Sequence, residues 1–222
     1  MIAGITLIER VYRQCKQAQG IDMILIATDS DEIAKHVNSF GGGAIMTPEH
    51  CANGTERIAY AAKHLAEDFD IIINVQGDEP LIEPSVIEQV AKAFENDLVK
   101  IATPISLIVE KNDINNPNIV KVVTDANDDV LYFSRSIIPF DRTENKSYMA
   151  YWRHIGLYAF RRKILEEIRD LPSTELENIE KLEQLRWLYH GYKIRAVRVE
   201  NTSIEVNTIE DVKKVEEILK NK

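Results

Sequence analysis

The chain has 222 residues, 45% of them hydrophobic, a size that suits one globular α/β domain with room for a subdomain. Its 27 basic and 36 acidic residues give a formal net charge of -9, which argues against a general binder of nucleic acid or of anionic membranes. Cys15 and Cys51 are too few for a disulfide scaffold or a zinc site and suit a reducing cytosol. No apolar run approaches ~20 residues and no signal peptide is evident, so we expect a cytoplasmic protein without membrane insertion.

Helices and strands alternate through the first hundred residues. Thr6 and Glu9 have the spacing of a capping box, and Asp29 or Ser30 can cap the second helix. Apolar spacing predicts helices at residues 6–18, 30–40, 55–66 and 83–95, and strands at 22–28, 44–46 and 71–75. This alternation is typical of an α/β domain with a Rossmann-like, doubly wound and mostly parallel sheet.

The pattern changes after Lys100, where strands follow one another with only turns between them. This arrangement predicts a small antiparallel subdomain over about residues 101–160, within a single domain that spans residues 1–222. Strands are expected at 101–109, 119–125, 130–134, 153–160 and 193–199, and helices at 176–189 and 208–220.

An acidic loop follows the buried strand at 71–75. Ligands of parallel α/β sheets bind beyond the carboxyl ends of the strands. Asp78 and Glu79 therefore occupy the position where such an enzyme places its chemistry. The alternative interpretation is an ordinary polar turn.

A phosphate-binding loop is missing from the start of the sequence. The chain has neither a GxGxxG motif nor a P-loop, and its first cations, Arg10, Arg13 and Lys16, fall inside the first predicted helix. A doubly wound nucleotide-binding domain usually begins with a strand and a glycine-rich loop. Either the phosphates are bound elsewhere or the chain lacks its first element.

Five motifs then occur in order, at Asn53-Gly-Thr-Glu-Arg57, Val75-Gln-Gly-Asp-Glu-Pro80, Tyr132-Phe-Ser-Arg-Ser-Ile-Ile-Pro139, Arg153-His-Ile-Gly-Leu-Tyr158 and Leu182-Glu-Gln-Leu-Arg186. Together they resemble the CMP-Kdo synthetases, the 3-deoxy-manno-octulosonate cytidylyltransferases, over nearly the whole chain. The resemblance implies a fold of the nucleotide-diphospho-sugar transferase type. It also implies a nucleotidyltransferase that uses Mg²⁺ to transfer CMP from CTP to 3-deoxy-manno-octulosonate (Kdo) for lipopolysaccharide biosynthesis, and a cytoplasmic homodimer.

Two features depart from the family pattern. Met1-Ile-Ala-Gly4 aligns just after the family's N-terminal strand and phosphate-binding loop. We therefore expect both to be absent, and the chain as written to be nearly inactive. The family's C-terminal metal-binding Asp falls on Asn207, whose amide oxygen is an uncharged and weaker ligand for Mg²⁺.

The resemblance assigns the nucleotide and the metal to residues of the first half. It makes Asp78 the main Mg²⁺ ligand, with Asn207 as the second, and places Gln76 near the reacting sugar. It implies that cytosine is selected by the residues Asn53, Gly54, Thr55 and Arg57. A helix start offers free backbone N–H groups to a base or ribose. The alternatives are a solvent-facing Gln76, simple capping by Thr55, and a solvated helix face for Arg57.

The resemblance assigns the acid sugar to residues of the second half, namely Arg135, His154, Tyr158, Glu183 and Gln184. Arginine forms bidentate pairs with carboxylates. Tyr158 lies four residues beyond His154, on the same face of the predicted strand. Glu183 shares the predicted helix at 176–189 with Gln184 and has the spacing to pair with Arg186. The alternatives are a structural role for His154 and, for the residues of the predicted helix, a charged and solvated helix face.

Two rival functions remain open from the sequence. One is a cytidylyltransferase for a related acid sugar such as 8-amino-Kdo. The other is a non-catalytic remnant that binds sugar or dimerises, which the absent loop and Asn207 favour and the intact motifs oppose.

Overall fold

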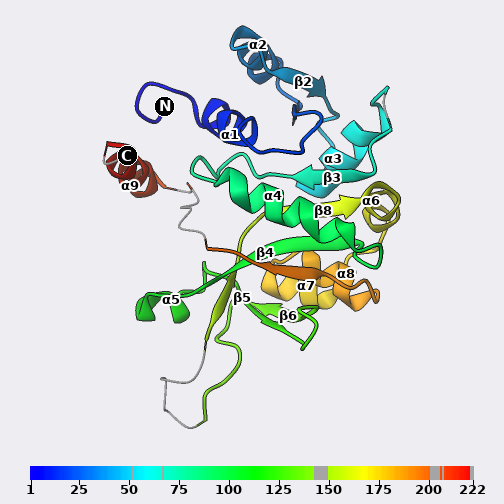
Figure 1. Ribbon diagram of the computed structural model, residues 1–222, viewed down its shortest axis with the longest axis vertical. Coiled ribbons are helices and arrows are strands. Elements are labelled where there is room, and N and C mark those ends of the chain that lie inside the picture. Colours follow the sequence, from blue (N-terminus) through cyan, green and yellow to red (C-terminus); the bar gives the residue numbers. More distant parts are fainter. Residues whose placement is uncertain (52, 67, 143–149, 201–205, 207, 221–222) are drawn as a thin grey trace. The chain divides into compact units, whose positions relative to one another are not determined.

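The computed structural model of the chain describes residues 1–51, 53–66, 68–142, 150–200, 206 and 208–220. The chain divides into two compact units, unit 1 with Met1–Gln89 and Asn201–Lys222 and unit 2 with Val90–Glu200 (Figure 1). No helix in the described part of the chain is long and apolar enough to cross a membrane.

Unit 1 alternates helices and strands as the sequence predicts. Its elements are α1 (Leu7–Cys15), β1 (Leu25–Thr28), α2 (Asp31–Ser39), β2 (Gly43–Met46), α3 (Gly54–Lys63), β3 (Ile71–Asn74) and α9 (Ile209–Lys220). Helix α4 (Pro84–Lys92) crosses the boundary between the units. Strands β1 and β2 pair in parallel, with Leu25 opposite Gly43 and Thr28 opposite Met46. Their carboxyl ends therefore lie side by side.

The first and last elements of unit 1 share a hydrophobic cluster. Ile2 and Val215 are both almost fully buried and pack with Leu81. The cluster is completed by the partly buried side chains of Leu7, Val206, Val212, Ile218 and Leu219. Burial of these apolar surfaces holds α9 to the start of the chain, since each fully buried aliphatic side chain contributes about 1.5–3 kcal/mol.

The capping box predicted for the first helix is wrong. Thr6 precedes α1 but makes no side-chain cap, because its hydroxyl is hydrogen-bonded to Nε2 of His36 at 2.7 Å. Glu9 pairs with Arg13, one turn further along the same helix. The cap predicted for α2 is confirmed at Ser30, whose hydroxyl accepts the N–H of Ile33.

Both cysteines belong to unit 1 and both are free. Cys15 ends α1 in a buried position, and burial raises the pKa of its thiol to about 11. Cys51 is half-buried and lies two residues before the cap of α3. Neither takes part in a cluster that could hold a metal, and the described residues contain no group of three or more His, Cys, Asp or Glu side chains suited to that purpose.

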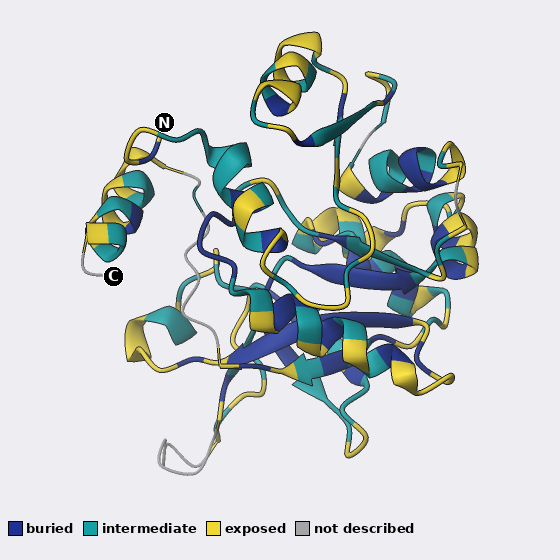
Figure 2. Cartoon of the chain, turned by 45° about the horizontal axis from the view of Figure 1, so that its top comes forward, coloured by how far each residue is buried: buried dark blue, intermediate teal, exposed yellow. Residues whose placement is uncertain are grey.

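Unit 2 is built around β4 (Ile101–Leu107), of which every residue but the last is buried. Figure 2 shows this strand in dark blue through the middle of the unit. The other elements are η1 (Ala93–Glu95), α5 (Lys111–Ile114), β5 (Lys121–Thr124), β6 (Val130–Ser134), β7 (Trp152–His154), β8 (Tyr158–Arg161), α6 (Arg162–Arg169), α7 (Glu175–Glu180), α8 (Gln184–Tyr189) and β9 (Arg195–Arg198).

The antiparallel strands expected at about 101–160 are confirmed, but the expectation of a mostly parallel sheet needs correction. Among the described pairings inside the two units, β1 with β2 and β4 with β9 are parallel. Strand β4 pairs antiparallel with β7 and β8, and β5 pairs antiparallel with β6 and β7. The antiparallel strands thus form most of the sheet of unit 2. Apolar runs reveal that a strand is buried, but they carry no information about its direction.

The strand predicted at 153–160 is present as two strands with a break at 155–157. The break follows from Thr103, a fully buried residue of β4. Its hydroxyl donates to the carbonyl of Leu157 at 2.7 Å, and the backbone N–H of Ile155 reaches the carbonyl of Pro104. The chain therefore passes along the edge of β4 with an irregular step between β7 and β8.

The helix predicted at 176–189 is also divided. Thr174 and Glu177 form a complete capping box at the start of α7, and α7 ends at Glu180, followed by Lys181 with the left-handed backbone angle φ of 55°. Such an angle is uncommon outside glycine. Helix α8 then starts afresh at Gln184. Periodicity alone cannot reveal this break, because both halves keep apolar residues at helical spacing.

Candidate active site

The motif at 53–57 forms the start of α3 in unit 1. The side chain of Asn53 accepts the backbone N–H of Glu56 at 2.8 Å and caps the helix. Thr55 is buried. A β-carbon placed on Gly54 would lie 3.4 Å from the amide nitrogen of Asn74 and within 3.9 Å of the Gln76 amide. The helix start therefore lies beside the chain that leaves β3, as expected for a site at a strand end.

Arg57 has a structural role that the sequence did not reveal. Its guanidinium donates to Asp29, which follows β1, at 2.7 Å and to the hydroxyl of Thr47, which follows β2. The hydrogen bond from Arg57 holds the pKa of Asp29 below its ordinary value. Arg57 thus links α3 to the carboxyl ends of two parallel strands. The alternative considered from the sequence, a side chain on a solvated helix face, does not describe these contacts.

Asp78 lies in the loop after β3 with one side-chain oxygen unsatisfied. Its Oδ1 is buried and has no hydrogen-bond partner, and burial raises the pKa of the carboxyl above its ordinary value. Buried polar atoms without partners are rare and call for an explanation. A cation beside Oδ1 would supply one.

The C-terminal segment of unit 1 approaches Asp78 through Val206, whose backbone N–H donates to the Asp78 carbonyl at 2.9 Å. Asn207, the other residue assigned to the metal, lies outside the described residues. Asp78 therefore offers a carboxylate oxygen to a cation, with Gln76 two residues before it in the chain.

His154 occupies a fixed, neutral state in unit 2. Its Nε2 lies 3.0 Å from the hydroxyl of Thr103. Since that hydroxyl donates its single proton to the Leu157 carbonyl, Nε2 must carry the proton that joins the two side chains, and Nδ1 is left as an acceptor. Burial lowers the pKa of His154 to about 3.

Tyr158 extends this cluster. Its ring centroid lies 5.1 Å from that of His154 and 5.0 Å from that of Trp187. The hydroxyl of Tyr158 is buried without a hydrogen-bond partner. Burial and the negative charge of Glu183 raise its pKa well above the ordinary value. The predicted residues His154, Tyr158 and Glu183 thus share one region, although His154 and Tyr158 lie on two strands rather than one.

Helix α8 contributes two further buried groups to this region. Gln184, at its first position, is 5% exposed. Trp187 is buried, and its indole Nε1 has no hydrogen-bond partner. Glu177 of α7 binds Arg186 through both carboxylate oxygens, at 2.5 and 2.8 Å. Arg186, which the sequence suggested could pair with Glu183, is thus bound by a residue nine positions before it.

Arg135 follows β6 and uses most of its guanidinium on backbone carbonyls. Nε donates to Glu180 O at 2.8 Å, Nη1 to Pro117 O at 3.0 Å and Nη2 to Lys181 O at 3.5 Å. Three of its five N–H groups are engaged in this way, which leaves two for a ligand. The role predicted for Arg135 at a sugar carboxylate remains a prediction.

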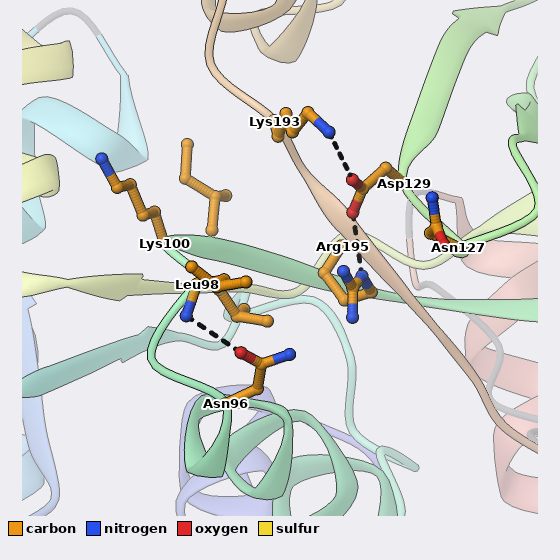
Figure 3. Close-up of a pocket in the computed structure, with 9 residues that line it drawn as sticks. Asn96, Leu98, Lys100, Asn127, Asp129, Lys193 and Arg195 are labelled. Carbon is orange, nitrogen blue, oxygen red and sulfur yellow. Dashed lines mark hydrogen bonds and ion pairs between the residues drawn. The ribbon is translucent and has the colours of Figure 1, made fainter.

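A hollow of about 600 Å³ lies elsewhere in unit 2, at the amino ends of β4 and β9. Figure 3 shows Asp129 between Lys193 and Arg195, which it binds at 3.0 and 2.9 Å. Residues of the hollow also include Asn96, Leu98, Val99, Lys100, Ile101 and Asn127. None of the predicted site residues lines it. The ion pairs attach the turn between β5 and β6 to β9, where Ala196 N also donates to Asp128 O.

The comparisons with known proteins identify the family of the chain. The sequence pattern of the cytidylyltransferase family matches residues 1–194. A 3-deoxy-manno-octulosonate cytidylyltransferase of Myxococcus xanthus is 43% identical over 99% of this chain and 88% of its own length. The chain belongs to this family of cytidylyltransferases. A solved CMP:2-keto-3-deoxy-manno-octonic acid synthetase complexed with CTP superposes with a TM-score of 0.93 at 35% identity, covering 100% of this chain and 90% of that one.

Another relative acts on a different sugar by name. The 8-amino-3,8-dideoxy-manno-octulosonate cytidylyltransferase of Shewanella baltica is 44% identical over 98% of this chain and 89% of its own length. The nucleotide-diphospho-sugar transferase fold expected from the motifs is confirmed by the structural match. The expected loss of the family's first strand and phosphate-binding loop finds no support in these comparisons, and neither does the near-inactivity inferred from that loss.

Several residues of the two clusters were not singled out from the sequence. Asn74 is a polar residue that ends the apolar run of β3, and this position was the signal that could have identified it. Thr103 and Trp187 lie within apolar runs and look like ordinary core residues in the sequence. Their importance depends on contacts with His154 and Tyr158, which come from distant parts of the chain.

The neutral state of His154 predicts a pH dependence of stability. Because the folded pKa, about 3, is below the ordinary value of 6.5, the unfolded chain binds a proton that the folded chain does not. The free energy of unfolding should therefore fall as the pH falls below 6.5, by at most about 1.4 kcal/mol per pH unit from this residue. Urea unfolding of the wild type and of His154→Gln between about pH 7 and about pH 4 measures it. The variant should lose less stability over this interval; equal losses would contradict the assignment.

Proposed function

We propose that this chain transfers the CMP group of CTP to Kdo and releases pyrophosphate, which supplies CMP-Kdo for lipopolysaccharide biosynthesis. The observation that carries the proposal is the grouping of the motif residues. Gly54, at the start of α3, lies beside Gln76 in unit 1, and His154, Tyr158 and Glu183 share one region of unit 2. The names of relatives such as the Myxococcus xanthus protein support the choice of substrates.

The residues present fit a magnesium ion. Asp78 offers a buried oxygen that lacks a partner, and a hard carboxylate oxygen is the ligand that Mg²⁺ prefers, with substrate phosphates supplying further oxygens. The ion would also stabilise the ionised form of this carboxyl, which burial disfavours. When bound, it would neutralise charge on the α-phosphate. Asn207 would be a second, neutral ligand.

The start of α3 would hold the nucleotide. A helix start can present backbone N–H groups to a base or a ribose hydroxyl, and α3 starts at Gly54, directly after the Asn53 cap. The lack of a side chain on Gly54 keeps the space beside Asn74 and Gln76 open. Arg57 would act indirectly in this arrangement, by fixing the helix on the ends of β1 and β2.

The cluster of unit 2 would hold the acid sugar. Tyr158 has a hydroxyl without a partner, and His154 has an accepting Nδ1. Both suit sugar hydroxyls, which donate and accept. Glu183 and Gln184 add an acceptor and an amide, and the two remaining N–H groups of Arg135 suit the sugar carboxylate. Since the pKa of His154 is about 3, this side chain would orient a hydroxyl rather than take its proton.

The reaction would be an in-line displacement at the α-phosphorus. The anomeric hydroxyl of Kdo forms the new P–O bond, the bond to pyrophosphate breaks, and the hydroxyl proton is released. Positioning and charge compensation supply most of the rate enhancement in phosphoryl transfers. The family resemblance assigns Gln76 to the reacting sugar, where its amide would orient the attacking hydroxyl.

A second candidate substrate is the 8-amino sugar. The identity to the Shewanella baltica protein, 44%, is as high as that to the Myxococcus xanthus protein, 43%. Overall identity therefore does not separate the two sugars.

We also propose a cytoplasmic homodimer. Exposed apolar side chains in the predicted dimerisation segment support it, since such side chains are favoured at subunit interfaces. They are Leu107, Val109, Leu131, Ile137 and Phe140. The mass of the protein in solution, by light scattering, tests this proposal, and a monomer at micromolar concentration would oppose it.

The substrate assignment predicts a direct assay result. With CTP and Mg²⁺, the purified chain should release pyrophosphate on addition of Kdo at a rate at least about tenfold above that with 8-amino-Kdo, a difference of about 1.4 kcal/mol in transition-state binding. The measurement compares kcat/KM for the two sugars, with no sugar as the blank. A higher kcat/KM for 8-amino-Kdo would make that sugar the substrate. No pyrophosphate release with either sugar would refute the proposed function.

The metal assignment predicts the effect of Asp78→Asn. Turnover should fall by about two orders of magnitude or more. Because burial raises the pKa of Asp78, the ionised carboxylate weakens folding at neutral pH, so the variant should melt at the same temperature or higher. Mg²⁺ added with CTP should raise the melting temperature of the wild type more than that of the variant. Asp70→Asn, the same change before β3 at an exposed residue, is the control and should behave like the wild type. Normal turnover in Asp78→Asn would remove this residue from the mechanism.

A further inference from the structure

Unit 2 contains a lysine whose whole side chain is buried. Lys121, at the start of β5, is 0% exposed. Its ammonium donates to the carbonyls of Asn116 at 3.0 Å, Ile119 at 2.8 Å and Arg135 at 2.5 Å. An ammonium has three N–H groups, so every donor is used. Lysine is among the residues least often fully buried, and this one forms no ion pair among the described residues.

The three carbonyls join separate stretches of the chain. Asn116 and Ile119 belong to the loop before β5, and Arg135 follows β6. The same loop accepts Nη1 of Arg135 at the carbonyl of Pro117. Lys121 therefore fixes both the backbone of Arg135 and the loop on which the Arg135 guanidinium rests.

Glu180 holds the other side of Arg135. Its carboxylate accepts the Ser134 hydroxyl at 2.6 Å and the Arg135 backbone N–H at 2.9 Å. Its carbonyl accepts Nε of Arg135 at 2.8 Å. Both carboxylate oxygens and the carbonyl of one residue are thus committed to the end of β6.

Glu180 is also the last residue of α7, and the chain turns immediately after it. Lys181 takes the left-handed conformation, and α8 begins at Gln184. Glu183 and Gln184, assigned above to the sugar, follow this corner directly. Their position therefore depends on where Glu180 is held, which in turn depends on Arg135 and Lys121.

The charges of the group are consistent with this arrangement. Burial and the nearby Arg135 lower the pKa of Lys121, while Glu180 raises it. The network contains two cations, Lys121 and Arg135, and one carboxylate, Glu180. Loss of either Lys121 or Glu180 therefore changes the net charge around Arg135 as well as the hydrogen bonds of Arg135.

We infer that Lys121 and Glu180 are positioning residues of the sugar site, which hold Arg135, Glu183 and Gln184 in place without touching the substrate. The inference rests on the proposed function, since it requires that these three residues bind the acid sugar. A purely structural role would lower stability alone. A positioning role would also change the binding of one substrate and spare the other.

The test compares Lys121→Met and Glu180→Gln with Leu165→Ala. Leu165 is a fully buried residue of α6 with no contact to this network in the hydrogen bonds described, so its variant reports the effect of lost stability. Steady-state kinetics with CTP and Kdo should show a KM for Kdo raised about tenfold in Lys121→Met and about threefold or more in Glu180→Gln, with the KM for CTP changed by less than about twofold. Leu165→Ala should melt at a lower temperature and keep both KM values.

The double variant Lys121→Met with Glu180→Gln adds a second readout. If both residues act through Arg135, its effect on the KM for Kdo should be smaller than the product of the two single effects. Unchanged KM values in both single variants, or equal changes for CTP and Kdo, would overturn the inference. If Lys121→Met does not fold, Glu180→Gln decides by the same criterion. A wild type that fails to release pyrophosphate would instead refute the proposed function.

Discussion

The arrangement of unit 2 depends on β4 having hydrogen-bonded neighbours along both edges. Strands β7 and β8 follow one edge and β9 the other, so the interior of β4 can be buried without orphaned backbone groups. Thr103 then has a dry environment in which its hydroxyl is shared between Leu157 and His154. That one side chain thus binds the break between β7 and β8 and also the histidine whose ring lies against Tyr158. The positions of the candidate sugar residues thus follow from the pairing of β4 with strands on both of its edges.

In unit 1 the site residues are fixed by polar side chains at the ends of secondary-structure elements. Arg57 reaches residues after two parallel strands, and Asn53 satisfies a helix N–H that would otherwise be free. Both residues belong to a motif that resemblance assigns to the nucleotide. Their observed contacts are within the protein, so the motif first builds a fixed helix start, beside which the nucleotide would bind. Such support by neighbouring contacts is what a precise binding site requires.

Local patterns predicted much of this from the sequence. The limits of β6 and the cap at Ser30 were correct because a hydrophobic run after a turn and a hydroxyl before a helix are local signals. The capping box at Thr6 and the continuous helix at 176–189 were wrong because distant partners, His36 for Thr6 and Arg135 for Glu180, compete with local preference. Asp78, His154, Tyr158 and Glu183 could be named from motifs, whereas Lys121 and Thr103 could not, since a pattern does not show which carbonyls a side chain will meet.

The different environments of the two cysteines allow selective labelling of unit 1. Raised to about 11 by burial, the pKa of Cys15 keeps this thiol protonated and poorly reactive at neutral pH. Cys51 is half-buried, free, and two residues from the Asn53 cap. A thiol-directed fluorophore or spin label would therefore attach preferentially beside the start of α3, in the natural sequence and without engineered cysteines. The label would report on the helix start assigned to the nucleotide while unit 2 remained unmodified, since both cysteines of the chain lie in unit 1.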